Sequence, residues 1–409
     1  ALDTVRYYTL KDILNYKNTG ISGSIVPRII TIGVNLLFGA AKKGKSRLIY
    51  SLLQSIIITK EFLGLPTRRV GTILFYQIEE PTFLIKDRLI NNQLDDIDNE
   101  DVRHALETDQ IVILRDLDIS SGINQIKKDV KNFSVKHKVD LIIIDSLRAV
   151  MMNSSLSETS ADWAKPIAQL QGFSNLKNIA VIILDHTNAA GNPSGTSAKK
   201  GHANQILLLK EPEDKTEYPQ NALLLQTQPR EGTAANFIIQ AVRDGSVETL
   251  QLLKEEGVTE EILNLQIQIL KLLKKDEYKE GVVELGLRIE EIASLLNVKV
   301  TESLRSALNR LRESSFVDSN RKSRKDYYYI PNYILDLYGL TGILAKVEEF
   351  ELRLQDITVQ VQSATTQEEI MEAFKGLSTI NRHTIFKLLP PEEKERALKL
   401  YNNKPQSGN

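Results

Sequence analysis

The run Gly39-Ala-Ala-Lys-Lys-Gly-Lys-Ser46 constrains this chain more than any other feature, because it directly follows the apolar run Gly33-Val-Asn-Leu-Leu-Phe38. It has the spacing G-x-x-x-x-G-K-S of a phosphate-binding loop between a strand and a helix. The glycines let successive backbone N–H groups point at phosphate oxygens, and the positive end of the following helix strengthens the same site. We therefore expect a nucleoside triphosphate to contact the whole loop, namely Gly39, Ala40, Ala41, Lys42, Lys43, Gly44, Lys45 and Ser46.

Two residues of the loop and one distant acid predict the chemistry of bound ATP and Mg²⁺. The Lys45 ammonium is expected near the β- and γ-phosphates, where it would act in catalysis, and the Ser46 hydroxyl is expected to hold Mg²⁺. Asp145 ends the run Val139-Asp-Leu-Ile-Ile-Ile, and ligands bind at the carboxyl ends of strands in open parallel sheets. Asp145 is therefore the second expected metal ligand. Its alternative role is that of a turn aspartate at a strand end.

Hydrolysis also needs a group that orients or deprotonates water. Glu79 and Glu80 follow the apolar run 72–78, and we expect this strand to lie next to the strand before the phosphate loop. Glu79 is the candidate catalytic residue, whereas Glu80 is assigned to the N-terminus of a helix over 82–89, where acids complement the helix dipole; that assignment stays open for Glu79 too. His186, at the end of a strand, is a further catalytic candidate as a sensor of the γ-phosphate, or else a structural residue.

Short apolar runs alternate with amphipathic stretches from about residue 28 to 255, which predicts an α/β fold with a largely parallel sheet flanked by helices. The last strands follow without long helices between them, so that edge is expected to be antiparallel. The predicted strands are 34–38, 72–77, 111–114, 141–145, 180–184, 205–209, 223–226 and 237–241. Helices are predicted over 46–60, 123–137 and 161–176.

Composition places few limits on partners. Lys plus Arg number 52 and Asp plus Glu 53, so the net charge of −1 argues neither for nor against nucleic acid. The chain has no Cys, which excludes disulfides and thiolate metal sites. No apolar run reaches the ~18 residues of a membrane span, and the first residues do not resemble a signal peptide. We expect a soluble protein in the cytoplasm, with no membrane partner.

These motifs resemble the RecA/DnaB superfamily, and most closely its hexameric plasmid replicative helicases of the RepA type. The resemblance covers about residues 28–245. It rests on Gly39–Ser46, Ile78-Glu-Glu-Pro81, Ile144-Asp-Ser-Leu-Arg148, Asp185-His-Thr187 and Gly195-Thr-Ser-Ala198. It implies a RecA-like core, ATP hydrolysis at the subunit interfaces of a homo-oligomer, expected to be a hexamer, and Glu79 as the catalytic acid of the pair.

The resemblance also implies that Arg230 is a catalytic arginine finger, which reaches the nucleotide of a neighbouring subunit. The chain departs from the family at Gln228, where relatives often carry Lys, and at Ser194, where relatives often carry Arg. Lys199, Lys200 or Arg243 are alternatives for the role of the finger.

A ring would place the segment Thr187–Lys200 around single-stranded DNA. This segment is rich in Asn, Gly, Ser, Ala and Lys and is predicted to be a loop. Asn188, Lys199 and Lys200 are its candidate phosphate contacts. The alternative is a surface loop without a nucleic-acid role.

The character of the chain changes after about residue 260. Short helices over 263–274, 289–296 and 302–313 precede a hairpin over 315–330, and this order is typical of a winged helix-turn-helix domain. Helix 302–313 carries Leu304, Leu308 and Leu311 on one face. Its other face and the hairpin tip carry the remaining candidate nucleic-acid contacts: Arg305, Asn309, Arg312, Arg321, Lys322, Arg324 and Lys325.

We therefore predict four parts: an N-terminal segment (1–27), a RecA-like ATPase domain (28–258), a winged helix-turn-helix domain (259–335) and a helical extension (336–409). The leading hypothesis is an ATP-dependent DNA helicase or translocase that acts in the replication of a mobile element. One alternative is a RecA-like ATPase that loads or regulates partners on DNA without unwinding it. Another is a nucleotide-switched DNA-binding regulator whose output is the winged helix.

Overall fold

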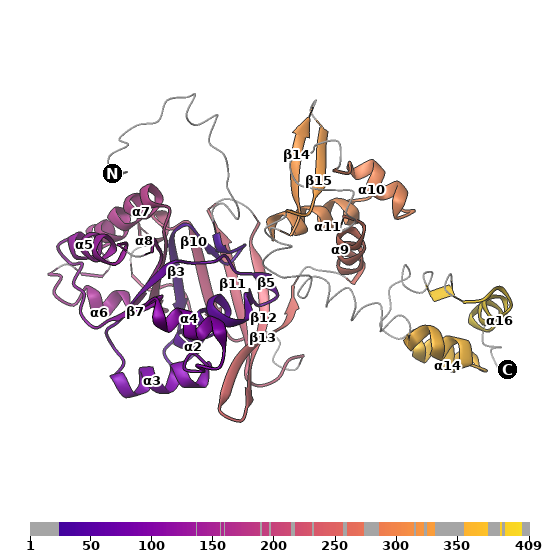
Figure 1. Ribbon diagram of the computed structural model, residues 1–409, viewed down its shortest axis with the longest axis horizontal. Coiled ribbons are helices and arrows are strands. Elements are labelled where there is room, and N and C mark those ends of the chain that lie inside the picture. The colour runs from indigo at the N-terminus through magenta and orange to yellow at the C-terminus, as the bar shows by residue number, and fades with distance from the viewer. Residues whose placement is uncertain are drawn as a thin grey trace. The chain divides into compact units, whose positions relative to one another are not determined.

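The computed structural model in Figure 1 divides the chain into two compact units, Ala1–Glu256 and Gly257–Asn409. The predicted boundary between the ATPase and winged-helix parts lies two residues further along the chain. The structure describes residues 24–402 except for 136, 156, 159, 189, 196–197, 214–216, 231–232, 257–259, 274–285, 315, 323–324, 332–355, 375–384 and 387–388.

A twisted sheet is the centre of the first unit. Its strands in chain order are β3 (Gly33–Gly39), β6 (Thr72–Gln77), β7 (Ile111–Leu114), β8 (Val139–Asp145), β9 (Ala180–His186), β10 (Gln205–Lys210), β11 (Ala222–Pro229), β12 (Ala235–Asp244) and β13 (Val247–Glu255). Among the described residues the spatial order is β13-β12-β11-β10-β3-β9-β8-β6-β7. The strands from β10 to β7 in this order run parallel, and β11, β12 and β13 complete an antiparallel edge.

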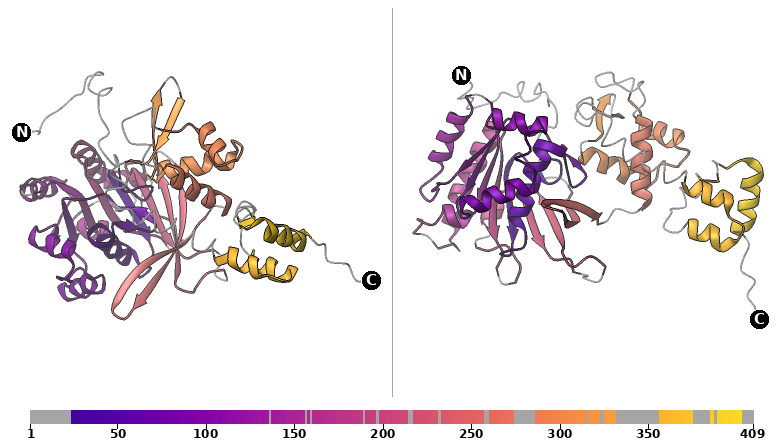
Figure 2. Two further views of the ribbon diagram at one scale, coloured as in Figure 1. Left: turned by 45° about the vertical axis from the view of Figure 1, so that its right-hand side comes forward. Right: turned by 60° about the horizontal axis from the view of Figure 1, so that its bottom comes forward.

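Helices cover the sheet, as Figures 1 and 2 show. They are α2 (Lys45–Gln54), α3 (Thr82–Asn91), α4 (Glu100–Glu107), α5 (Asn124–Phe133), α6 (Leu147–Val150), α7 (Lys165–Lys177) and α8 (Ala198–Gly201). A π-helical turn, η1 (Ser55–Thr59), follows α2, and a 3₁₀ turn, η2 (Ala161–Ala164), precedes α7. Two small antiparallel pairs are β1 (Ser24–Val26) with β2 (Ile30–Thr31), and β4 (Glu61–Phe62) with β5 (Leu65–Pro66).

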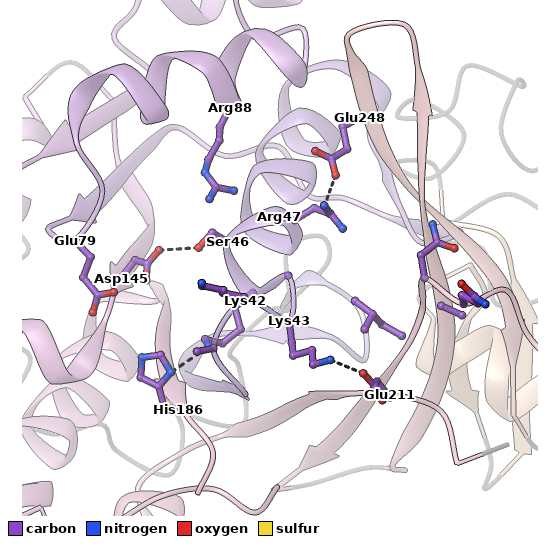
Figure 3. Close-up of a pocket in the computed structure, with 17 residues that line it drawn as sticks. Lys42, Lys43, Ser46, Arg47, Glu79, Arg88, Asp145, His186, Glu211 and Glu248 are labelled. Carbon is purple, nitrogen blue, oxygen red and sulfur yellow. Dashed lines mark hydrogen bonds and ion pairs between the residues drawn. The ribbon is translucent and has the colours of Figure 1, made fainter. Parts of the chain in front are cut away.

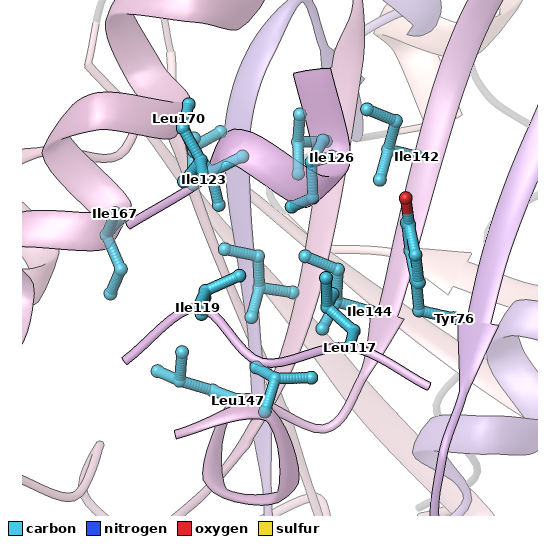
Figure 4. Packing of buried hydrophobic residues seen from close by; sticks show 14 of the residues in the cluster. Tyr76, Leu117, Ile119, Ile123, Ile126, Ile142, Ile144, Leu147, Ile167 and Leu170 are labelled. Carbon is cyan, nitrogen blue, oxygen red and sulfur yellow. The ribbon is translucent and has the colours of Figure 1, made fainter. Parts of the chain in front are cut away.

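The apolar strands explain why both faces of the sheet are covered. Alternate residues point to opposite faces of a strand, so an unbroken Ile, Leu and Val run needs partners on both sides. On one face, Leu170 of α7 and Ile126 of α5 belong to the same buried cluster as Tyr76 of β6 (Figure 4). On the other face, the ring of Phe75 lies edge-on to that of Tyr50 in α2, with centroids 5.7 Å apart. The predicted α/β fold with a largely parallel, helix-flanked sheet is confirmed.

Several expectations need correction. Strand β6 does not lie beside the phosphate-loop strand, because β9 and β8 separate it from β3. Strand β13 was not predicted, and β1 falls inside the predicted N-terminal segment. The helix predicted to end at residue 60 is α-helical only to Gln54.

The second unit contains two separate hydrophobic clusters. The first joins α9 (Glu260–Leu273), α10 (Ile289–Leu295) and α11 (Glu302–Glu313) to the hairpin of β14 (Asp318–Lys322) and β15 (Lys325–Tyr329). The second contains α14 (Gln367–Ala373) and α16 (Pro391–Asn402). The hairpin lies within the predicted range 315–330, and its strands include residues that were assigned to the tip. Assignment of the first cluster to a winged helix stays a prediction.

Candidate nucleotide site

The phosphate loop has the backbone geometry that its sequence predicts. Gly44 has a φ of 90° and stands immediately before α2, and this left-handed conformation favours glycine because a Cβ would be strained there. The carbonyl of Gly44 accepts the first helical hydrogen bond, from the N–H of Leu48 at 2.9 Å. The loop therefore passes directly into the N-terminus of a helix, where backbone N–H groups can bind an anion.

The topology brings the polar strand ends to one edge of the sheet. Gly39 at the end of β3 pairs with His186 of β9, and Gln77 at the end of β6 pairs with Asp145 of β8. The phosphate loop, His186 and Asp145 line a cavity of about 590 Å³ (Figure 3). This arrangement explains how Glu79 reaches the same cavity although its strand is not next to β3.

Lys45 is held inside the phosphate loop. Its ammonium donates to the carbonyls of Gly39 at 2.7 Å and Ala40 at 3.1 Å, and lies 3.4 Å from Nδ1 of His186. Burial lowers the pKa of Lys45, and the charges of nearby carboxylates, Asp145 first, oppose this shift. An incoming phosphate group would supply a stronger anionic partner than these carbonyls.

Asp145 and Ser46, the two predicted metal ligands, contact each other. The Ser46 hydroxyl donates to Oδ2 of Asp145 at 3.3 Å, and the amide of Gln77 donates to the same oxygen at 3.0 Å. Burial raises the pKa of Asp145 to about 6, although the hydrogen bond from Gln77 opposes this shift. Mg²⁺ is usually held through one or two carboxylates plus substrate phosphates, so this donor set beside the phosphate loop fits Mg²⁺-ATP. A carboxylate in this place would hold the metal in its ionised form.

The two neighbouring acids after β6 have different surroundings. Glu79 is exposed to the cavity, and its carboxylate accepts a hydrogen bond from the hydroxyl of Ser146, directly after Asp145. Glu80 is half-buried and pairs with Arg88 of α3 at 2.6 Å. Of the two acids, Glu79 therefore faces the space where a γ-phosphate and a water molecule would lie.

The far end of the cavity contains Arg47, Glu211 and Glu248, which sequence reasoning missed, beside the predicted Lys43. Arg47 of α2 pairs with Glu248 of β13, and Lys43 pairs with Glu211 after β10. These contacts join the phosphate loop and α2 to the antiparallel edge of the sheet (Figure 3). No sequence motif contains the three missed residues, and strand β13, which carries Glu248, was not predicted.

The burial of the Lys199 side chain contradicts its predicted contact with nucleic acid. Its side chain is 1% exposed, and its ammonium lies 2.8 Å from Oδ2 of Asp185 and 3.1 Å from Oε1 of Glu158. Lys200 on the same short helix is exposed. The Asn188 side chain accepts hydrogen bonds from two backbone N–H groups of its own turn, so Lys200 is the exposed cation of the predicted trio.

Arg230 follows β11, and it lies at the end of the sheet strands opposite to the end that carries the phosphate loop. Pro229 pairs with Gln205 at the start of β10, whereas Leu209 near the end of β10 pairs with Gly39. Arg230 is exposed, and its backbone N–H donates to the carbonyl of Asn204 at 2.8 Å. This position separates Arg230 from the phosphate loop of its own subunit. Arg243, the alternative on β12, is also exposed.

Helix α11 has the predicted two-faced character. Leu304, Leu308 and Leu311 are buried, and Thr301 caps the helix by accepting a hydrogen bond from the N–H of Leu304. The opposite face presents Arg305, Asn309 and Arg312 to solvent. Of the basic hairpin residues, Lys325 is exposed, Arg321 and Lys322 belong to β14, and Arg324 lies outside the described residues.

Comparisons with known proteins agree with a nucleotide-binding core. Residues 23–192 match a family described as "AAA domain". One similar solved structure is described as an ATPase domain; it is 14% identical, with a TM-score of 0.42, and the match covers 56% of this chain and 93% of that chain. No curated protein sequence matches. The family match and the loop geometry support a P-loop ATPase core.

In the described part of the chain, no helix has the length and apolarity that a bilayer span requires.

Proposed function

We propose that this protein is an ATP-dependent DNA helicase or translocase of the RecA/DnaB type, resembling the RepA helicases, that works as a ring in the replication of a mobile element. A hexamer, movement on single-stranded DNA and a cytoplasmic location are parts of this proposal. One observation carries it furthest: the phosphate loop, the Ser46–Asp145 pair and the Glu79 carboxylate face a single cavity.

The chemistry follows from the side chains of that cavity. When ATP is bound, Lys45 would turn from the loop carbonyls toward the phosphates, and Ser46 and Asp145 would hold Mg²⁺, which neutralises phosphate charge. Glu79 can accept a hydrogen bond from water and align it with the γ-phosphate. Its contact with Ser146 fixes the carboxylate next to the metal-binding strand.

A neighbouring subunit would complete the site. Arg230 and the phosphate loop of the same chain lie at opposite ends of the sheet strands, so a role as an arginine finger would require a second copy of the chain. Such fingers stabilise the negative charge of the transition state. Hydrolysis in one subunit would then alter the contact with the next, which is how a ring could move along a strand.

DNA contacts are proposed for Lys200 and for the second unit. The exposed Arg305, Asn309 and Arg312 of α11 have the residue types that contact phosphates and base edges. They extend from a helix anchored by buried leucines. The winged-helix assignment belongs to this proposal.

The test is ATP turnover by the full-length protein with and without single-stranded DNA. We expect Mg²⁺-dependent hydrolysis that single-stranded DNA stimulates, and loss of turnover in Lys45→Ala. Hydrolysis that DNA leaves unchanged would remove the translocase proposal and keep the ATPase. If Lys45→Ala hydrolysed ATP as fast as the wild type, the hydrolysis would not come from this nucleotide site.

A second candidate is a nucleotide-switched DNA-binding regulator. The burial of Lys199 favours it, because the segment 187–200 then offers fewer cations to a single strand, whereas α11 keeps its exposed arginines. Tight binding of duplex DNA that changes with the bound nucleotide, together with unstimulated turnover, would select this candidate.

A further inference from the structure

A buried lysine lies beside the nucleotide site without belonging to the cavity. Lys199 comes from the short helix α8, and its ammonium is enclosed by two carboxylates and an indole ring. It lies 2.8 Å from Oδ2 of Asp185, 3.1 Å from Oε1 of Glu158 and 4.8 Å from the ring centroid of Trp163. A buried charge is costly unless it is paired, so the two carboxylates stabilise the lysine in this position.

Asp185 connects this cluster to the nucleotide site. While its Oδ2 contacts Lys199, its Oδ1 accepts a hydrogen bond from the backbone N–H of His186 at 2.8 Å. The imidazole of His186 faces the cavity, with Nδ1 3.4 Å from the ammonium of Lys45. One carboxylate therefore joins the buried lysine to the residue that stands beside the phosphate-loop lysine.

The segment after His186 is fastened to the same cluster. The hydroxyl of Ser194 donates to Glu158 at 3.0 Å, and its backbone N–H donates to the carbonyl of His186 at 3.1 Å. Gly195 has a φ of 74°, and a Cβ added there would lie 2.7 Å from Nζ of Lys199. The lysine thus fills the space under a turn whose left-handed backbone favours glycine.

We propose that Lys199 is a positioning residue for the nucleotide site: through Asp185 it fixes the strand end that carries His186, and it fastens α8 to the sheet. This inference rests on the proposed ATPase function. It replaces the predicted contact of Lys199 with DNA. Displacing a group near the reacting phosphates by about 1 Å can cost on the order of 100-fold in rate, so loss of the lysine affects turnover through His186.

The first test uses Trp163 as a reporter, because it is the single tryptophan of the chain. In the full-length protein, Lys199→Met should shift the tryptophan emission, since it removes the ammonium from the ring. The matched control is Lys165→Met, which breaks an exposed ion pair with Asp162 close to the same ring. Unchanged emission in Lys199→Met would overturn the contact and the proposal.

The second test is a double-mutant cycle on ATP turnover. Lys199→Met should lower kcat by about 10- to 100-fold and change KM for ATP much less. In a His186→Ala background, Lys199→Met should have little further effect, within about threefold, because residues that act as one unit are not additive. Multiplicative effects would overturn the proposal. Absence of wild-type turnover would instead remove the proposed ATPase function and, with it, this inference.

A third variant separates positioning from folding. Combining Lys199→Met with Asp185→Asn removes both charges, and the amide oxygen introduced at position 185 can still accept from the N–H of His186. We expect this double variant to recover thermal stability relative to Lys199→Met but to keep the low kcat, because the tie to α8 is still missing. Recovery of both stability and kcat would assign Lys199 a purely structural role and overturn the proposal.

Discussion

Two adjacent glutamates after β6 differ in what their side chains contact, and the roles proposed for them rest on this difference. Glu79 faces the cavity and contacts Ser146, whereas Glu80 pairs with Arg88. We expect Glu79→Gln to lower kcat by about 10²- to 10⁴-fold, the usual contribution of a group that activates water. ATP binding should persist, because Lys45 and the loop are untouched. Single-turnover hydrolysis and equilibrium nucleotide binding measure the two effects.

Glu80→Gln is the matched control for this prediction. It has the same chemical change one residue later, and it weakens the ion pair with Arg88 while the Glu79 carboxylate and the phosphate loop keep their contacts. Most of the turnover should remain. If Glu80→Gln lost turnover and Glu79→Gln kept it, the two roles would be reversed.

The buried Asp185–Lys199 pair predicts a pH-dependent effect on stability. Burial raises the pKa of Asp185, and Lys199 opposes this shift while Glu158 adds to it. Because the pKa in the folded state lies above the unfolded value, the contribution of Asp185 to stability is present at low pH and is lost as pH rises through the folded pKa. Removing Lys199 raises that pKa further, so the loss becomes larger.

Lys199→Met should therefore be destabilised little near pH 4 and by about 3–5 kcal/mol at pH 8, the range found when one partner of a buried pair is removed. Denaturant unfolding at several pH values measures this difference. Lys165→Met should stay close to wild type throughout. A destabilisation of Lys199→Met that does not change with pH would contradict the role of the Asp185 charge.

At the scale of elements, helix α11 combines a buried leucine face with an exposed basic face. Arg305→Ala and Arg312→Ala should each weaken DNA binding and reduce the slope of log affinity against log salt by about 1, because each removes one phosphate contact. Affinity measured over a range of salt concentrations gives the slope. Lys399→Ala on α16, a cation of the same unit that pairs with Glu395, should leave the slope unchanged. An unchanged slope in both arginine variants would remove α11 from the DNA-binding surface.

Elements could be predicted wherever the hydrophobic pattern is strong. The bounds of β6 and β7 were predicted to the residue, because Ile, Leu, Val and aromatic runs stop abruptly at polar residues. Strand β13 was missed because it is a half-exposed edge strand with charged residues, so its pattern differs little from a loop. The two-residue strands β4 and β5 are too short to leave a periodic signal.

Residues of the candidate site could be predicted only where one short segment of the sequence contains the complete motif. The phosphate loop is such a segment, and Asp145 is an acid at the end of an apolar run. Lys199 was misassigned because the sequence shows its charge but not its partners, which come from β9 and from the loop before α7. The order of strands, which separates β6 from β3, likewise depends on long-range pairing that local patterns do not encode.

At the scale of the whole molecule, Arg230 and the phosphate loop lie at opposite ends of the strands of one sheet. If active sites form between copies of the chain, Lys45→Ala and Arg230→Ala should each be inactive alone. Mixing them before assembly should restore turnover at about one quarter of the interfaces, since half of the loops and half of the fingers remain intact and each heterologous interface combines one of each. Full activity of Arg230→Ala, in a protein that assembles normally, would contradict the shared site.

The central claim is that ATP hydrolysis drives movement on DNA, and strand displacement on a forked duplex tests it most directly. We expect the wild type to separate the strands only with hydrolysable ATP and Mg²⁺. Lys45→Ala and Glu79→Gln should fail to separate them under the same conditions. Intact ATP hydrolysis by the wild type without any strand separation would contradict the helicase account.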